Sequence, residues 1–361
     1  MTKPKLIFGS LANSPRRRFR RSLLAWYDSH RRDLPWRASR DPYRVWLSEV
    51  MLQQTRVAAV IEHYREFLQR FPTVQKLAAA RQASVLAAWS GLGYYRRARM
   101  MHAAAKAIVC DHGGKFPATE EGLRQLPGIG RYTAAAIASI AFEEPVAVVD
   151  GNVERVLQRV SGKRLAGEEL WTAANHLLDT KRPGDFNQAM MELGAVVCTP
   201  RMPACLTCPV IGLCATRGEL SVQVKAAKQK EREIHYAFNR QNGAVFLVRR
   251  ARDASQMPGM WELPELSADG HMPAEQLGLF DGLRAGSPVR FASCRNDKAG
   301  GNDRGPWFTL KHSITVTNYT VRVWEEAALS GISGKWIARE RLRRIALTGL
   351  TRKILRTAEM L

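Results

Sequence analysis

Apolar residues recur every three to four positions through most of the first 217 residues, a spacing that places them on one face of a helix. A typical set comprises Val45, Trp46, Val50 and Met51. We count about ten helices between Arg16 and Arg217 and find no convincing strand before residue 230. The pattern predicts a mostly α first domain, residues 1–216.

Beyond this helical stretch the pattern changes twice. Residues 217–235 are charged, short of large apolar side chains and without a core face, so we expect a linker. Ala244–Val248 is a short apolar run that predicts a buried strand, and polar and apolar positions alternate in Ile314–Trp324, which predicts a second strand. Arg339–Leu361 again shows mainly helical spacing. Residues 236–361 are therefore expected to form a second, α+β domain.

A very tight turn separates two helical runs in the first domain. Gly128 and Gly130 flank the single apolar residue Ile129, and only glycine enters positive φ without a steric penalty. The second helix, Arg131–Phe142, starts with unpaired N–H groups, and such helix starts bind phosphate. An ordinary joint between helices is the alternative.

A lone acid, Asp150, follows Gly130 by twenty residues. We expect it at the N-cap of the next helix, whose apolar residues Val153, Val156, Leu157 and Val160 are in phase. A cap alone is the structural alternative.

Glu49 is a second acid with a distinctive setting. It lies among apolar neighbours on a helix that we expect to be buried, and burial raises the pKa of a carboxyl toward that of a general acid. An ion pair with Arg37 or Arg56 is the structural alternative. Together with Asp150, Glu49 supplies the two carboxylates that cleavage of a glycosidic bond requires. One protonates the leaving group, and the other faces the developing oxocarbenium cation.

The segment Gly91–Arg99 is a glycine turn that presents aromatic and basic residues. Chemistry on a stacked base requires the nucleotide to be extruded, and an inserted side chain can then hold the gap. Tyr94 and Gln54 are candidates for this insertion. A structural turn with solvated arginines is the alternative.

Charge narrows the class of partner. The 361 residues include 55 Lys+Arg against 33 Asp+Glu, which gives a net charge of +22 and favours nucleic acid ahead of membrane. No run of about 18 apolar residues and no signal peptide is evident, so we expect no membrane association. We expect a cytoplasmic, DNA-associated bacterial protein, and nothing in the sequence suggests other than a monomer.

Four of the six cysteines lie within 17 residues: Cys198, Cys205, Cys208 and Cys214. Thiolates this close together bind one metal ion or cluster. A structural zinc site is the alternative, although zinc sites commonly pair two distant CxxC units. Arg201, between two prolines of the loop, is expected to be exposed and to meet a phosphate.

These segments together resemble the MutY family of adenine DNA glycosylases, within the helix-hairpin-helix superfamily. The resemblance covers residues 30–215 and is carried by LPWR, WLSEVMLQQT, GLGYY, LPGIGRYTA, VVDGNV, FNQAMMELGA and the cysteine loop. It implies a helix-hairpin-helix near 122–142 and a [4Fe–4S] cluster on 198–214. It also implies removal of adenine mispaired with 8-oxoguanine or guanine in double-stranded DNA.

The resemblance further implies a role for each matching residue. Glu49 would protonate N7 of adenine, and Asp150 would stabilise the oxocarbenium ion, electrostatically or through a transient covalent bond. Tyr132 and Asn152 would position the sugar and Asp150. The remaining roles are adenine binding by Arg37 and Gln188, contacts around the opposite oxidised guanine by Gln54, Thr55, Leu92 and Tyr94, and phosphate binding by the amides of Gly128 and Gly130.

Tyr132 also separates two types of enzyme. Relatives resembling endonuclease III carry a lysine just after LPGxGR, which attacks the sugar and then cleaves the strand. Tyr132 has no amine, so no Schiff base forms by that route. We therefore expect a monofunctional glycosylase whose lyase activity is at most weak.

The C-terminal domain resembles the Nudix-like module with which the family recognises 8-oxoguanine, and Pro258–Pro264 matches the start of that module. The Nudix hydrolase signature is absent from 265–290, so we expect binding without hydrolysis. The family usually carries an aromatic-Ser/Thr-His triplet, and this chain has Ile314-Thr315-Val316 there. Thr315 keeps the hydroxyl, but Val316 replaces the histidine. Either discrimination between 8-oxoguanine and guanine is weaker as a result, or His312 substitutes for the missing histidine.

Two other interpretations stay open. One is another glycosylase of the same superfamily, acting on thymine mismatches or oxidised pyrimidines. The other is a non-catalytic iron–sulfur DNA-binding protein with a decayed pocket. The presence of Glu49 and Asp150 argues against the second, and Tyr132 with the appended domain argues against the first.

Overall fold

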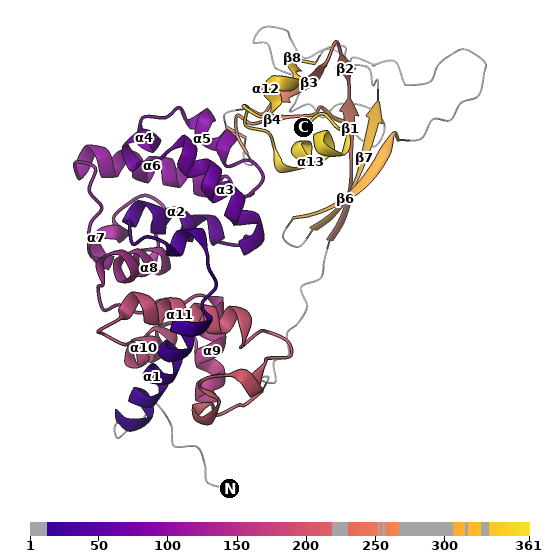
Figure 1. Cartoon of the computed structure of the whole chain (residues 1–361). Helices are drawn as coiled ribbons and strands as arrows, with labels where there is room; N and C mark the ends of the chain where they lie inside the picture. The colour runs from indigo at the N-terminus through magenta and orange to yellow at the C-terminus, as the bar shows by residue number, and fades with distance from the viewer. Residues whose placement is uncertain are drawn as a thin grey trace, which may run out of the picture. The chain divides into compact units, whose positions relative to one another are not determined.

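The computed structural model describes residues 13–218, 230–251, 253–254, 257–266, 306–314, 317–325 and 332–361 (Figure 1). These residues fall into two compact units. The first contains the described residues up to Ala80 and from Arg99 to 218, and the second contains Arg81–Ala98 with the described residues from 230 onward. The predicted boundary after residue 216 lies close to the break between the units. The assignment of 81–98 to the first domain differs from this division.

The first unit is helical, as predicted. Its helices are α1 (Asn13–His30), η1 (Pro35–Arg37), α2 (Pro42–Leu52), α3 (Val57–Arg70), α4 (Val74–Ala78), most of α6 (Arg96–Asp111), α7 (Glu120–Arg124), α8 (Arg131–Phe142), α9 (Gly151–Ser161), α10 (Glu168–Leu177), α11 (Pro183–Val196), η2 (Cys205–Thr207) and η3 (Ile211–Leu213). Among the described residues, the first strand begins at Lys230, in agreement with the sequence pattern.

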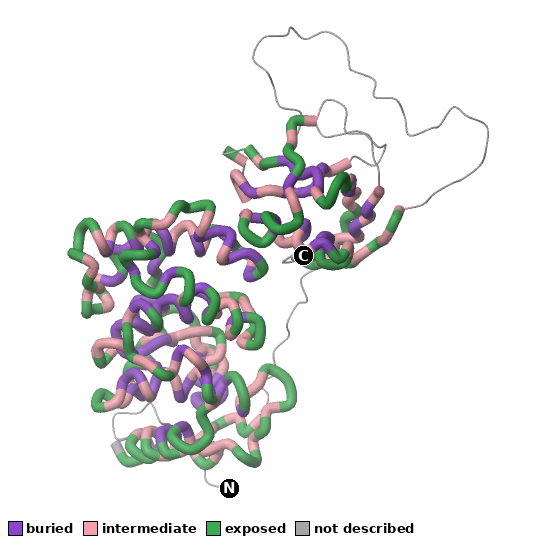
Figure 2. Tube along the Cα trace, turned by 45° about the horizontal axis from the view of Figure 1, so that its top comes forward, coloured by how far each residue is buried: buried purple, intermediate pink, exposed green. Residues whose placement is uncertain are grey.

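Helix α8 is the centre of this unit. Every residue from Thr133 to Ile140 is buried, because the helix packs against α2, α7 and α11 on different sides (Figure 2). Four of these residues are alanines, whose small side chains allow the neighbouring helices to approach closely. A helix that is apolar all round is a core helix. This packing fixes the start of α8, where Tyr132 lies, against α2 and α11.

The second unit combines α5 (Gln82–Ala88) with two four-stranded sheets. One sheet has the order β5-β1-β7-β6, in which β1 and β7 are parallel, and the other has the order β2-β3-β4 with β8 paired to β3. The strands are β1 (Lys230–Phe238), β2 (Arg240–Gln241), β3 (Ala244–Arg249), β4 (Trp261–Glu262), β5 (Glu265–Leu266), β6 (Phe308–Ile314), β7 (Thr317–Glu325) and β8 (Gly334–Ala338). Two helices follow, α12 (Arg339–Leu342) and α13 (Gly349–Thr357).

The core of the second unit joins both sheets to the last helix. Val321 and Val323 of β7, Leu247 of β3 and Ile354 of α13 are fully buried in one cluster. The buried strand predicted at Ala244–Val248, the alternation around Val321 and the mainly helical end of the chain are confirmed.

The predicted linker is wrong at its C-terminal end. Strand β1 begins at Lys230 and pairs residue by residue with β7 from Lys230 to Phe238. Its first four residues are exposed, so the strand is held there by backbone pairing, which leaves no apolar signal in the sequence. Residues 219–229 lie outside the described part of the chain.

Within the residues that the structure describes, no helix has both the length and the apolar character needed to span a bilayer.

Candidate functional site

Glu49 and Tyr132 form the centre of the site. Glu49, on α2, is 7% exposed, and the Tyr132 hydroxyl at the start of α8 donates to its Oε2 at 2.6 Å. The same hydroxyl lies 3.3 Å from Sδ of Met191 on α11. Burial raises the pKa of Glu49 to about 7, with a further upward contribution from the negative charge of Asp150. The site therefore holds a carboxyl group that carries a proton near neutral pH, as a general acid requires.

Asp150 caps α9, as the sequence predicts. Its Oδ1 accepts the backbone N–H groups of Asn152 at 2.9 Å and Val153 at 2.7 Å, and its Oδ2 accepts Asn152 Nδ2 at 2.9 Å. Both carboxylate oxygens are thus fixed in direction by the start of the helix. The negative charge of Asp150 raises the pKa of Glu49, so the two side chains lie close enough to interact electrostatically.

Arg155 connects this cap to the cysteine loop. Its guanidinium donates to Asn152 Oδ1 at 2.8 Å, to the Gly194 carbonyl at 2.6 Å and to the Cys198 carbonyl at 2.7 Å. The first two acceptors lie beside the Asp150 cap and on α11, and the third belongs to the first cysteine of the loop. Nothing in the sequence pattern singled out Arg155. Its only signal is that it lies three residues after Asn152, on the same face of α9.

Helix α11 approaches the cap at a glycine. A Cβ added to Gly194 would lie 2.6 Å from the Cβ and 2.9 Å from the carbonyl oxygen of Asn152. Any larger residue would therefore displace one of the two helices. This contact brings Met191, on the same helix, up to the Tyr132 hydroxyl.

Arg37 is committed to a buried ion pair. It donates to Glu192 Oε2 at 2.8 Å, while Arg32 donates to Glu192 Oε1 at 2.7 Å. Burial opposes ionisation of Glu192, but the hydrogen bonds from Arg32 and Arg37 outweigh it and lower its pKa to about 2. The alternative in which Arg37 neutralises Glu49 directly is therefore not realised, although its charge does lower the pKa of Glu49 somewhat. Glu192 was not predicted from the sequence.

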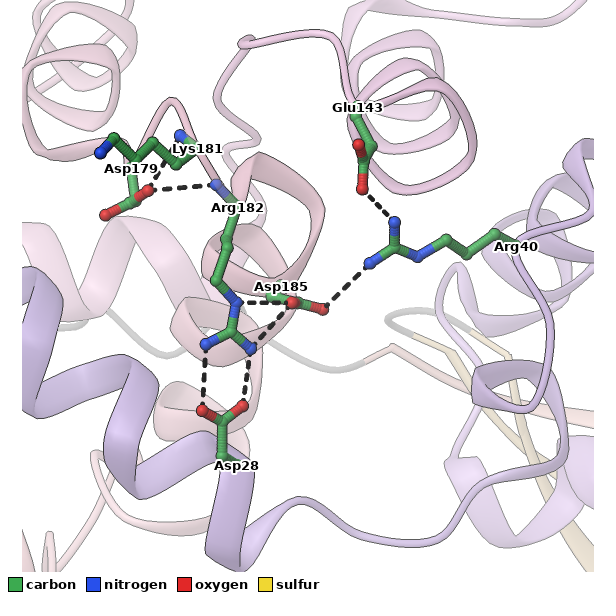
Figure 3. Close-up of polar contacts among 7 residues, drawn as sticks. All are labelled: Asp28, Arg40, Glu143, Asp179, Lys181, Arg182 and Asp185. Carbon is green, nitrogen blue, oxygen red and sulfur yellow. Dashed lines mark hydrogen bonds and ion pairs between the residues drawn. The ribbon is translucent and has the colours of Figure 1, made fainter.

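Gln188, the other predicted adenine-binding residue, lines a small polar pocket with Arg40, Glu143 and Asp185. Charges of alternating sign surround this pocket (Figure 3). Arg182 donates to both oxygens of Asp28, at 2.7 and 3.0 Å, and pairs with Asp185 at 2.8 Å. Arg40 pairs with Glu143 and lies 4.0 Å from Asp185. The network ties α1, α8 and α11 together beside Gln188.

The predicted helix-hairpin-helix is present as α7, the Leu126–Gly130 turn and α8. Gly128 has φ +74°, and a Cβ there would lie 2.4 Å from the Cβ of Met100, so the turn requires glycine on both grounds. Ile129 is buried, whereas Gly128 and Gly130 are exposed. The turn thus presents backbone at the start of a helix, which is where a phosphate binds.

The remaining predicted DNA contacts differ in exposure. Gln54, Tyr94 and Arg201 are exposed, and Thr55 is half-buried, whereas Leu92 is buried and contributes to packing. In the second unit, His312 is half-buried on β6, and burial followed by the charge of Lys353 lowers its pKa. Thr315 and Val316 lie outside the described residues.

The four clustered cysteines line one pocket of about 370 Å³ whose other walls are mostly apolar. Arg159 donates to Cys198 Sγ at 3.3 Å and to the carbonyls of Thr199 and Pro200, and the backbone N–H of Arg217 donates to Cys214 Sγ at 3.4 Å. In the described part of the chain, no three side chains of His, Cys, Asp or Glu converge closely enough for a single metal ion. Arg159 is a third residue, after Arg155 and Glu192, that sequence reasoning missed.

The chain is similar in sequence and fold to known proteins. Residues 47–170 match the model of the HhH-GPD superfamily of base excision DNA repair proteins. The adenine DNA glycosylase of Schizosaccharomyces pombe is 34% identical over 319 residues, which cover 69% of this chain and 69% of that protein. The adenine DNA glycosylase of Mus musculus is 52% identical over 223 residues, which cover 56% of this chain and 43% of that protein.

The chain spans 43%, 39% and 41% of the lengths of its mouse, human and rat relatives, so its similarity to them is confined to part of those proteins. Among solved structures, a thermostable thymine-DNA glycosylase superposes with a TM-score of 0.55 at 30% identity. That superposition covers 58% of this chain and 99% of the glycosylase.

Proposed function

The chain belongs to the helix-hairpin-helix family of adenine DNA glycosylases, and from that premise we propose that it excises adenine mispaired with 8-oxoguanine or guanine from double-stranded DNA. The observation that carries the proposal is the contact between Tyr132 and Glu49, whose pKa is about 7, beside the capped carboxylate of Asp150. Hydrolysis of an N-glycosidic bond calls for two carboxyl groups, one that protonates the leaving base and one that faces the developing cation.

The proposed reaction uses one proton and one water molecule. Glu49 donates its proton to N7 of the extruded adenine, and the C1′–N9 bond breaks with its electron pair remaining on the base. Asp150 faces the oxocarbenium ion that forms at C1′, and its carboxylate is held in place by Asn152 and Val153. Water then adds to C1′ and loses a proton, leaving an abasic site.

The proposed enzyme is monofunctional. Tyr132 stands where a lyase would carry its nucleophilic lysine, and its hydroxyl is already engaged with Glu49. A phenol cannot form the Schiff base that precedes strand cleavage. The product is therefore the intact strand with an abasic sugar.

We also propose that the cysteine loop holds a [4Fe–4S] cluster. Four thiols around a pocket with mostly apolar walls, together with N–H donors to Cys198 and Cys214, match the surroundings that iron–sulfur clusters require. Cys198, Cys205, Cys208 and Cys214 would be the ligands. The cluster would brace Arg201 and the loop against DNA and would take no part in the glycosidic step.

We propose that residues 236–361 form a Nudix-like module that recognises the base opposite the adenine, with His312 as the candidate contact. The exposed residues Gln54, Tyr94 and Arg201 and the hairpin glycines would contact the duplex, which a monomer would bind. The alternative is a glycosylase for another mismatched base, and the resemblance to a thymine-DNA glycosylase structure keeps it open.

The test is single-turnover base release from duplexes with adenine opposite 8-oxoguanine, guanine, cytosine or thymine. Fast release opposite 8-oxoguanine and slower release opposite guanine is the expected result. Equal rates opposite both would remove the oxidised-base reader but keep the adenine glycosylase. Asp150→Asn is the control, and it should bind the duplex without releasing the base. No adenine release from any duplex would favour the alternative.

A further inference from the structure

The turn that joins α5 to α6 is unusually strained and presents one aromatic ring. Gly91 and Gly93 have φ values of +112° and +69°, and Tyr94, which carries a Cβ, has φ +45°. The left-handed conformation costs free energy for such a residue, so the surroundings must impose it. The Tyr94 side chain is 48% exposed, whereas Leu92 and Tyr95 on either side are buried.

Arg97 and Trp89 bind the backbone of the turn before Tyr94. Arg97 donates to the carbonyls of Leu92 at 3.1 Å and Gly93 at 3.4 Å, and Trp89 Nε1 donates to Gly93 at 3.1 Å. The Arg97 guanidinium also lies 5.4 Å from the ring centre of Trp89 and 5.5 Å from that of Tyr94. The hydrogen bonds fix the backbone before Tyr94, and the Arg97 guanidinium packs against the Tyr94 ring.

The two ends of the turn, at Ser90 and Tyr95, bind residues of the Leu347–Arg352 segment. The hydroxyl of Tyr95 donates to the Leu347 carbonyl at 2.9 Å, and the hydroxyl of Ser90 donates to the same oxygen at 3.3 Å. Arg352, on α13, donates to the Ser90 carbonyl. The two ends of the turn are therefore fastened to a segment that follows them by about 250 residues and belongs to the same unit.

We propose that the Leu347–Arg352 segment is a positioning element for Tyr94, acting through Tyr95 and Ser90. The inference rests on the proposed function and takes Tyr94, one of the two insertion candidates, as the side chain that fills the space left by the extruded adenine. A ring that displaces a stacked base is opposed by the tendency of the duplex to restack, so it needs a rigid support. A turn with three residues at positive φ would relax without such support. The Leu347–Arg352 segment thus takes part in base extrusion, and the module to which it belongs reads the opposite base.

Tyr95→Phe is the first variant to test, because it removes one hydroxyl from a buried ring. We expect single-turnover adenine release to slow by about fivefold to tenfold, the usual effect of one lost hydrogen bond. The matched control is Tyr43→Phe, which removes another buried hydroxyl that donates to a backbone carbonyl, that of Phe71 at 2.7 Å in the helical unit. The control should leave the rate of release unchanged.

A double-mutant cycle separates positioning from general damage to the fold. If Tyr95 acts through Tyr94, then adding Tyr95→Phe to Tyr94→Ala should slow release no further. Arg352→Gln, a second variant at the other fastening point, should behave in the same way. Equal losses with and without the Tyr94 ring, or no loss from either variant, would overturn the proposal.

A measurement without chemistry keeps this test independent of the proposed function. Extrusion is followed by the fluorescence of 2-aminopurine placed in the adenine position, with Asp150→Asn as the background to prevent excision. Tyr95→Phe should reduce the fluorescence increase at saturating protein, and Tyr43→Phe should not. A chain that extrudes 2-aminopurine but releases no adenine would contradict the proposed function and leave the role of the turn standing.

Discussion

Glu49 and Glu192 are both buried carboxyls, yet their environments shift their pKa values in opposite directions. Burial raises the pKa of Glu49 to about 7, because its hydrogen bond from the neutral Tyr132 hydroxyl does not compensate for lost hydration. Glu192 accepts from two guanidinium groups, which hold its pKa near 2 despite burial. Glu49 therefore holds a proton near neutral pH, whereas Glu192 stays ionised and binds two arginines.

The raised pKa of Glu49 predicts the pH dependence of base release. The acid needs its proton, so the single-turnover rate should be level below pH 7 and fall about tenfold per pH unit above it. Glu49→Gln should abolish release at every pH. A rate that stays level up to pH 9 would show that Glu49 is not the acid.

Glu192→Gln should destabilise the helical unit by about 3–5 kcal/mol, because it leaves Arg32 and Arg37 beside a buried neutral group. Since the folded pKa of Glu192 lies below its ordinary value of 4.5, its contribution is fully present above pH 4.5 and disappears as the pH falls toward 2. Urea unfolding of both proteins at pH 7 and pH 3 measures this. A difference in stability that does not shrink at pH 3 would contradict the assignment.

At the scale of elements, four helices meet at the site, and one of them is α2, which carries Glu49. The start of α9 fixes Asp150, the start of α8 carries Tyr132, and α11 contacts both through Gly194 and Met191. Arg155 then links α9 and α11 to the cysteine loop. A planar guanidinium suits this position, because it donates in several fixed directions at once.

Gly194→Ala should therefore impair catalysis more than folding. Its Cβ would meet Asn152 at 2.6 Å and push the cap away from α11, at a cost of about 1–3 kcal/mol in stability. Displacement of a positioned group by about 1 Å slows an enzyme by roughly a hundredfold. Gly212→Ala is the control, since the nearest atom to its added Cβ is 3.8 Å away. Rates equal to that of the control would show that α11 tolerates the shift.

At the scale of the whole molecule, the net charge of +22 suits a polyanionic partner. Binding of the Asp150→Asn variant to an undamaged duplex should weaken by about 10³-fold or more between 50 and 200 mM salt, as expected for at least six phosphate contacts. Fluorescence anisotropy over this salt range gives the slope. A binding affinity that hardly changes with salt would mean that few of the basic side chains contact DNA phosphates.

The division into units was predicted only in part. Periodicity identified the helical stretch and the strand around Val321, and the strand around Val245 was identified as an apolar run because it is buried at four consecutive positions. The strand at Lys230–Glu233 was missed because its side chains are exposed and its order comes from pairing with β7. The segment 81–98 carries helical spacing like its neighbours, and its contacts with residues far along the chain, such as the hydrogen bond from Tyr95 to Leu347, go with its place in the second unit.

The sequence by itself determined the chemistry that local pattern encodes. The glycines of the hairpin, the cap at Asp150 and the buried position of Glu49 each depend on neighbours close in the chain, so a single stretch suffices to predict them. Tertiary structure alone decided which partners these groups have. The pairing of Arg37 with Glu192, the contact of Tyr132 with Glu49 and the bridge of Arg155 to Cys198 join segments that are 43 to 155 residues apart. No local pattern specifies such contacts, because they arise only when helices from distant parts of the chain pack in one core.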